Sequence, residues 1–186
     1  MKKQKNEDNL YIEQFLAGDE KGFEMLVKKY QNRALNIVYS LIGRDGESED
    51  ITQEVFLKVY RNLRSFRERS QFSTWLYRIV VNTTYDFSRR RRHFVNNEGI
   101  LNNIASGRRG PGDTLLGKEK ERMIQMALKN VPFKFRVALV LKDIDGLSYI
   151  EIAGVLRCSI GTVESKIYRA RKFLKTELLR SRGESK

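Results

Sequence analysis

Apolar side chains recur at the spacing of an α-helix along most of this sequence, and few residues interrupt them. Between Phe23 and Leu41, apolar residues return every three or four positions, which places them in one stripe along a helix. The chain contains only two prolines, Pro111 and Pro132, so long helices meet no obstacle elsewhere. No segment shows the strict alternation typical of a half-buried strand. The sequence therefore predicts an all-α protein.

The predicted helices fall into two groups. Helices expected over residues 9–17, 19–41, 48–63 and 72–90 form the first group, and helices ending near 130, over 133–143 and from 148 onward form the second. Between them, residues 94–117 are rich in Asn, Gly and Ser, a composition typical of a linker. We therefore expect two small helical domains, residues 1–93 and 118–186, joined by a flexible linker over 94–117 that lets them reorient.

The positive charge of the chain limits the classes of molecule that it is expected to bind. Its 186 residues carry a net charge of +13, which favours nucleic acid, an anionic membrane surface or an acidic protein as partner. The sequence has no apolar run long enough to span a bilayer, so we expect no membrane insertion. A single cysteine, Cys158, and the lack of a signal peptide favour a cytoplasmic location. Because His93 has no partner at metal-ligand spacing, we expect no enzyme activity, catalytic residue, metal or cofactor.

The most specific local signal lies between Leu147 and Lys175. Ser148 and Glu151 have the S-x-x-E spacing of a capping box in front of a short helix, and a second helix begins near Gly161 after a tight turn. Two helices joined in this way form a helix-turn-helix, whose second helix enters the DNA major groove. The alternative is a helical hairpin whose charges are solvated. The residues that we predict to face DNA are Thr162, Glu164, Ser165, Lys166, Tyr168, Arg169 and Lys172.

Two further surfaces stand out in the first group of helices. On the helix expected over 48–63, acidic and amide side chains surround one exposed leucine, Leu57, as in a protein-docking patch or on an ordinary solvated face. On the helix from residue 72, aromatic and arginine side chains share the outer face and lead into the block Arg89–Arg92. Single-stranded nucleic acid requires rings for its bases and cations for its phosphates. Tyr77 and Tyr85 are equally compatible with packing on a neighbouring helix.

Taken together, these motifs resemble bacterial sigma factors of the sigma-70 family. Regions 2.1 to 2.4 of that family are similar to DITQEVFLKVYRNL, SFR and FSTWLYRIVVNTTYDFSRRRR, and region 4 is similar to VPFKFRVALVLKDIDGLSYIEIAGVL and GTVESKIYRARKFLK. The similarity covers about residues 10–92 and 119–178. No region 1.1 or folded region 3 fits into the remaining length, which favours the extracytoplasmic-function (ECF) group. The resemblance implies a region 2 helical bundle followed by a region 4 helix-turn-helix.

The resemblance also implies a role for each surface. The helix-turn-helix would bind the −35 promoter element as duplex DNA, through the residues given above. The leucine-centred face would dock on the clamp helices of the largest subunit of core RNA polymerase, through Asp50, Gln53, Glu54, Leu57 and Arg61. The following loop and helix would recognise and melt the −10 element, through Ser65, Phe66, Arg67, Tyr77, Arg78, Asn82, Tyr85, Arg89 and Arg90.

The partners that the resemblance implies are promoter DNA, core polymerase (clamp helices and flap) and an anti-sigma factor that holds the protein inactive. The free chain is expected to be a monomer. The alternative is a dimeric helix-turn-helix regulator that acts without polymerase, which explains only the C-terminal motif. A nuclease is a third class, but the sequence lacks clustered metal-binding carboxylates. Three features depart from the family pattern: Phe133 replaces a usual acid, Glu164 replaces a frequent base, and Arg108 and Arg109 lie in a linker that is often acidic.

Overall fold

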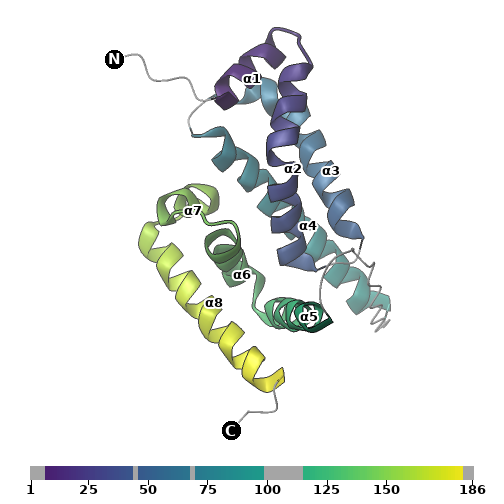
Figure 1. The fold of residues 1–186 in the computed structure, drawn as a ribbon, viewed down its shortest axis with the longest axis vertical. Helices are drawn as coiled ribbons and strands as arrows, with labels where there is room; N and C mark the ends of the chain where they lie inside the picture. Colours follow the sequence, from purple (N-terminus) through teal and green to yellow (C-terminus); the bar gives the residue numbers. More distant parts are fainter. Residues whose placement is uncertain (1–6, 44–45, 68–69, 99–114, 182–186) are drawn as a thin grey trace.

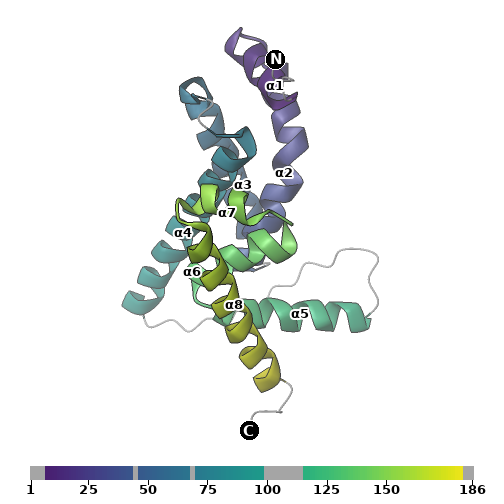
Figure 2. The same cartoon turned by 90° about the vertical axis from the view of Figure 1, so that its left-hand side faces the viewer.

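Helices make up nearly all of the chain that the structure, a computed structural model, describes, which is residues 7–43, 46–67, 70–98 and 115–181 (Figures 1 and 2). No strand occurs in these ranges, and the prediction of an all-α protein is confirmed. The elements in chain order are α1 (Glu7–Leu16), α2 (Lys21–Ile42), α3 (Glu47–Asn62), the 3₁₀ turn η1 (Leu63–Ser65), α4 (Phe72–Glu98), α5 (Leu115–Asn130), α6 (Phe133–Leu139), the π-helical turn η2 (Val140–Ile144), α7 (Tyr149–Leu156) and α8 (Ile160–Ser181).

Helices α1 to α4 pack as one bundle, which we call the N-terminal unit. α2 contacts the other three helices, and its predicted apolar stripe is buried fully or in part from Phe23 to Leu41. Glycines end the first two helices, because Gly18 and Gly43 adopt φ of 98° and 95°, values that other residues rarely reach. The N–H of Gly43 donates to the Tyr39 carbonyl at 2.7 Å. These turns set α2 against both of its sequence neighbours.

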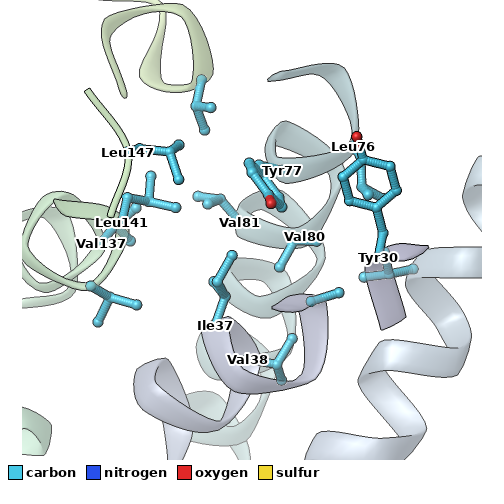
Figure 3. Close-up of a cluster of buried hydrophobic side chains, with 14 of the residues drawn as sticks. Tyr30, Ile37, Val38, Leu76, Tyr77, Val80, Val81, Val137, Leu141 and Leu147 are labelled. Atoms are coloured by element: carbon cyan, nitrogen blue, oxygen red, sulfur yellow. The ribbon is translucent and has the colours of Figure 1, made fainter. Parts of the chain in front are cut away.

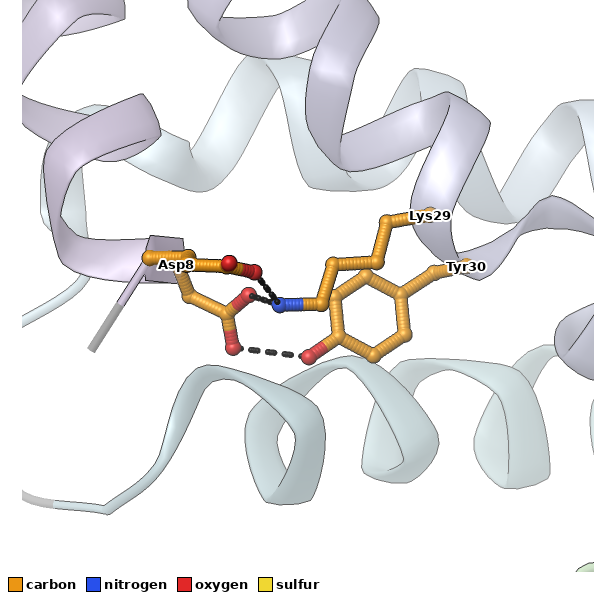
Figure 4. Close-up of polar contacts among 4 residues, drawn as sticks. Asp8, Lys29 and Tyr30 are labelled. Atoms are coloured by element: carbon orange, nitrogen blue, oxygen red, sulfur yellow. Dashed lines mark hydrogen bonds and ion pairs between the residues drawn. The ribbon is translucent and has the colours of Figure 1, made fainter.

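A buried carboxylate ties α1 to α2 (Figure 4). Asp8 is only 2% exposed, and it accepts hydrogen bonds from the Tyr30 hydroxyl at 2.7 Å and from Lys29 Nζ at 2.8 Å. Burial, followed by the bond to Asp8, raises the pKa of Tyr30, so this hydroxyl stays a neutral donor near pH 7. A buried charge requires such partners. The two hydrogen bonds to Asp8 hold α1 against α2.

Helices α5 to α8 form the C-terminal unit. Its own apolar cluster joins Leu128, Val131, Phe135, Leu139 and Ala170, with Leu174 packed against it. Helices α7 and α8 form the predicted helix-turn-helix. The predicted capping box is confirmed: Ser148 Oγ accepts from the Glu151 N–H at 3.3 Å, and the Glu151 carboxylate accepts from the Ser148 N–H at 2.8 Å.

Replacing Ser148 by alanine is expected to lower the stability of the protein by about 1 kcal/mol, or about 2–4 °C in Tm, because the first turn of α7 loses its cap. The capping bonds lower the pKa of Glu151 below its ordinary 4.5. Their contribution is therefore complete above that value and disappears as the pH falls through the lower folded pKa. Thermal unfolding should show the difference from wild type at pH 7 and a smaller one in acid. Thr176→Ala, at an exposed hydroxyl within α8, is the matched control.

The two units pack against each other through one buried hydrophobic cluster that includes residues of both, and the prediction that the linker lets them reorient stays a prediction. Figure 3 shows Val137, Leu141 and Leu147 of the C-terminal unit facing Tyr77 and Val81 of α4, and all of them belong to one buried cluster. The cause is the second face of α4, which is apolar enough to be covered by protein. Removing that face from water favours the packed arrangement. We call this surface of contact the interunit interface.

The predicted linker is shorter on both sides in the structure. α4 continues to Glu98 and α5 begins at Leu115, so helices extend into both ends of the range 94–117. The middle of the linker, with Arg108 and Arg109, lies outside the described residues. The helix α4 continues past the arginine block to Glu98, although the sequence beyond that block is mostly polar. The predicted domain limits, 1–93 and 118–186, stay predictions.

Candidate docking and nucleic-acid surfaces

α3 carries the first candidate surface, on the side that faces away from the bundle. Its inner side is buried at residues such as Val55 and Val59, whereas Leu57 is 55% exposed. Glu54 is half-buried and pairs with Lys58 at 2.8 Å. Because residues three and four positions apart share one face of a helix, the predicted docking residues lie together: Asp50, Gln53, Glu54, Leu57 and Arg61.

The segment that follows α3 is anchored by an aromatic cluster. The Phe66 ring lies 5.2 Å from the Trp75 ring and 6.0 Å from the Phe72 ring, between centroids. Ser65 and Arg67 on either side of Phe66 are exposed. The half-buried Phe66 thus holds the segment to α4, while its neighbours remain accessible. Trp75 is half-buried and is a member of this cluster.

The second half of α4 presents a mixed polar and aromatic side. Asn82, Tyr85, Arg89 and Arg90 are exposed, and Tyr85 keeps 44% of its surface accessible. Their spacing places Asn82, Tyr85 and Arg89 along one side of the helix. This side offers an amide for a base edge, a ring for stacking and cations for phosphates, which is the combination that single-stranded nucleic acid requires.

Tyr77 and Arg78, by contrast, are not on an open face. Tyr77 is 2% exposed, and burial raises its pKa. Arg78 is half-buried, and its Nη2 donates to the Gly154 carbonyl of α7 at 2.8 Å. Burial and the nearby Arg157 lower the pKa of Arg78. The prediction that both side chains lie on an exposed face is wrong for this arrangement, because the C-terminal unit covers that part of α4.

α8 carries the third candidate surface. Its inner side is buried at Val163, Ile167 and Ala170, as the sequence predicts, and Ser159 Oγ accepts from the Thr162 N–H at 3.3 Å where the helix begins. The outer side is open, and Tyr168 is 72% exposed. Of the predicted DNA-facing residues, Thr162 and Lys166 are half-buried, and the exposed ones are Glu164, Ser165, Tyr168, Arg169 and Lys172.

Sequence reasoning missed the residues that join the two units. Arg33 Nε donates to Asp145 Oδ1 at 3.1 Å, and Arg33 Nη2 donates to the Asp145 carbonyl at 3.1 Å. The Asp145 side chain is only 7% exposed. Burial raises the pKa of Asp145, and Arg33 acts in the opposite direction. These two residues are 112 positions apart, and no local pattern connects them.

The C-terminal unit also contains an apolar groove of about 430 Å³ between α5, η2 and α8. Asp143 and Arg171 line this groove, and Arg171 Nη2 lies 2.7 Å from Asp143 Oδ1 in an ion pair. Within the described ranges, no group of three His, Cys, Asp or Glu side chains is placed to hold a metal ion. In the same part of the chain, no helix is long and apolar enough to cross a membrane. The groove has the chemistry of a surface for an apolar protein side chain.

Comparison with known proteins identifies both units. The model of Sigma-70 region 2 matches residues 26–94, and that of Sigma-70 region 4 matches residues 121–174. The ECF RNA polymerase sigma-E factor of Haemophilus influenzae is 35% identical over 180 residues, which cover 92% of this chain and 95% of that protein. The sigma-E factor of Escherichia coli is 37% identical over 174 residues, which cover 89% and 91%. The sigma factor RpoE of Bartonella quintana, solved in complex with the anti-sigma factor NepR, is 26% identical with a TM-score of 0.70, covering 86% and 98%.

Proposed function

Because this chain belongs to the ECF group of the sigma-70 family, we propose that its two units divide promoter recognition between them. The observation that carries this proposal is the presence of separate exposed surfaces on α3 and α8 within one chain. A regulator that acts without polymerase explains only the α8 surface. A sigma factor uses both, since it must bind core RNA polymerase and DNA at the same time.

In the N-terminal unit, the α3 face docks on the clamp helices of the largest polymerase subunit. Leu57 is the apolar centre of this face, and Asp50, Gln53, Glu54 and Arg61 surround it. This arrangement of one apolar anchor within a polar rim is typical of protein interfaces. Burial of Leu57 on docking supplies most of the affinity, and the polar ring fixes the orientation.

The loop after α3 and the outer side of α4 capture the −10 element as a single strand. Ser65, Arg67 and Asn82 lie where polar contacts to bases are accessible, and Arg89 and Arg90 bind the backbone. Flipping a base out of the duplex costs a few kcal/mol, whereas stacking on a ring such as Tyr85 returns about 1–3 kcal/mol per base. The aromatic cluster around Phe66 holds this surface rigid.

In the C-terminal unit, the outer side of α8 enters the major groove at the −35 element. The first turns of α8 carry Thr162, Glu164 and Ser165 to the base edges, and Arg169 and Lys172 contact phosphates further along. Glu164 accepts a hydrogen bond well from the amino group of cytosine. On this side of α8, Tyr168 is 72% exposed.

A protein inhibitor controls this sigma factor, and its solved relative RpoE is bound to the anti-sigma factor NepR. The apolar groove between α5, η2 and α8 and the exposed Leu57 both offer surfaces for such a partner. The flap of the polymerase is the second partner expected for the C-terminal unit. The protein acts in the cytoplasm, where core polymerase is found, and it has no catalytic residue of its own.

Gel filtration with light scattering tests this proposal against the dimeric regulator. The free chain is expected to be a monomer, and mixing with sigma-free core polymerase is expected to shift it into a one-to-one complex. A stable dimer that does not join the polymerase, yet binds duplex DNA, would support the regulator and contradict the proposed function.

A further inference from the structure

The side of α8 that we assign to the −35 element contains one acid among cations, and we propose that this acid, Glu164, makes the protein select cytosine at one position of that element. Every other charged side chain between Arg157 and Lys175 is a lysine or an arginine. The same carboxylate rejects guanine, adenine and thymine at that position. This inference rests on the proposed binding of α8 to the −35 duplex, and it concerns the sequence of that duplex.

Glu164 lies in the second turn of α8, at the end of the helix that enters the major groove. Its side chain is exposed. The preceding turn leaves space beside it, because a Cβ placed on Gly161, three positions earlier, meets no atom within 4 Å. The N-terminal residues of a recognition helix contact the edges of bases. The position of Glu164 therefore brings its carboxylate to a base rather than to a phosphate.

No neighbour on the helix neutralises Glu164. Side chains on the same side of a helix lie three or four positions apart. At those distances from Glu164 the chain has uncharged residues only, which are Ile160, Gly161, Ile167 and Tyr168. The Glu164 carboxylate also forms no ion pair or hydrogen bond with the residues that the structure describes. The carboxylate is therefore available to a ligand.

The two hydroxyls that we predict to reach base edges beside Glu164 are already bonded within the chain. Ser165 Oγ donates to the Thr162 carbonyl at 2.9 Å, and Thr162 Oγ1 shares a hydrogen bond with Ser159 Oγ at 2.9 Å. Both hydroxyls therefore have less capacity left for a base than a free hydroxyl has. Hydrogen bonds to a charged acceptor are also roughly twice as strong as neutral ones. Glu164 is thus the strongest source of discrimination among these three residues.

An ionised carboxylate can only accept hydrogen bonds, which restricts the base that it tolerates. In the major groove, guanine presents only acceptors, and thymine presents an acceptor and a methyl group. Adenine presents an amino donor beside the N7 acceptor, whose lone pair repels a carboxylate. Cytosine presents its N4 amino group alone. Cytosine is therefore the base that pairs with Glu164 without placing an acceptor against it.

The side chains around Glu164 increase the cost of a wrong base. Ile160 and Tyr168 lie four positions before and after it, and they are 45% and 72% exposed. When α8 enters the groove, these two side chains displace water from around the carboxylate. A charge that loses its water without gaining a partner is strongly unfavourable. A mismatched base pair usually weakens binding by about 5- to 150-fold, and we expect a penalty in this range at the Glu164 position.

A binding selection measures this preference directly. The complex of the full-length protein with core polymerase is incubated with duplexes that carry the −10 sequence mapped from its start sites and a randomised −35 segment. Sequencing of the bound duplexes should show one position of that segment at which cytosine is strongly enriched. In Glu164→Gln that position should change to adenine, because an amide donates to N7 and accepts from N6. In Glu164→Ala it should show no preference, while the other positions of the element stay as in wild type.

Fluorescence anisotropy at fixed salt gives the size of the effect, with two duplexes that differ only in cytosine or thymine at that position. The wild-type complex should bind the cytosine duplex about 5- to 150-fold more tightly, and the Glu164→Ala complex should bind the two nearly equally. Glu164→Ala should also bind the thymine duplex more tightly than wild type does, because the unpaired carboxylate is gone. A residue that only supported the fold of α8 would not improve binding to any duplex when removed.

The matched control is Glu177→Gln, which makes the same chemical change at the other acid of α8. Glu177 accepts from Asn130 at 2.7 Å and pairs with Arg180 at 2.9 Å, so its carboxylate is occupied within the chain. The sequence selected by this variant should be that of wild type. Circular dichroism and polymerase binding show that each variant is folded.

The inference is overturned if wild type selects a −35 sequence without a cytosine position, or if Glu164→Gln keeps the cytosine preference. It is also overturned if Glu164→Ala strengthens binding to every duplex equally, since the carboxylate then only repels phosphates. A wild-type complex that initiates transcription but selects no −35 sequence at all contradicts the proposed function of α8 itself. The two failures are distinguishable, because the first leaves a selected −35 sequence and the second leaves none.

Discussion

Replacing Gln53 and Leu57 together by alanine is expected to weaken binding to core polymerase by about 30- to 1,000-fold, because interface anchors contribute about 2–4 kcal/mol. Leu57 is 55% exposed on α3, and Gln53 lies one turn before it on the same face. The double variant should retain its stability, since neither side chain belongs to the core. Transcription directed by this protein should fall in the same proportion at limiting protein, while binding to −35 duplex DNA should not change.

The matched control replaces Gln14 and Leu16 by alanine. These two residues are also an exposed amide and an exposed leucine on a helix of the N-terminal unit, but they lie on α1 and are not among the predicted docking residues of α3. The control is expected to bind polymerase like wild type. Equal losses of polymerase binding in the two variants would mean that exposed leucines contribute only nonspecific hydrophobic contacts. The assignment of the α3 face would then be wrong.

Replacing Arg169 by alanine is the second prediction with a large effect. We expect promoter binding to weaken by about 1–3 kcal/mol, or roughly 5- to 150-fold, because a phosphate or base contact is lost from α8. Polymerase binding should be unchanged, because α3 belongs to the other unit. The binding of labelled promoter fragments by the polymerase complex, followed by fluorescence anisotropy at fixed salt, measures the loss.

Two controls make the Arg169 result interpretable. Its guanidinium lies 5.8 Å from the centroid of the Phe135 ring, so the substitution removes a contact worth about 0.5–1 kcal/mol at an exposed site. Thermal unfolding must show that the variant remains folded at the assay temperature. Arg180→Ala removes a cation farther along α8, where it pairs with Glu177 at 2.9 Å. If Arg180→Ala weakens promoter binding as much as Arg169→Ala does, the specific role assigned to Arg169 is wrong.

The two predictions together test the division of roles between the units. The α3 variant should fail at polymerase binding, and the α8 variant should fail at promoter binding. If both lesions affect the same step, the two surfaces do not act separately, and the roles assigned to the units are wrong.

Features that depend on neighbouring residues in sequence were predictable. The stripe of α2, the inner side of α8 and the capping box at Ser148 each follow from spacing within about one or two helical turns, and the structure has them where the sequence predicts them. The exposure of Leu57 was predictable for the same reason, because the spacing of apolar residues along α3 alone indicates which side of the helix faces the core.

Features that depend on contacts between distant segments were not predictable. Tyr77 and Val81 lie on the side of α4 opposite its first buried stripe, and a single helix gives no indication that a second unit covers them. Arg33 and Asp145 are ordinary charged residues until the fold brings them together across 112 positions. The sequence also shows no reason for Gly154 within α7, which becomes clear only from its distance to Thr74.

The most direct test of the central claim is transcription by sigma-free core polymerase on fragmented genomic DNA from the same source, with and without this protein. We expect discrete new start sites that appear only when both are present, with two shared sequence elements upstream at the −35 and −10 positions. The Gln53→Ala, Leu57→Ala double variant should lose all of these starts together. Core polymerase from the same organism that gives no new start site with the folded wild-type protein would contradict the assignment of promoter-specific initiation to this chain.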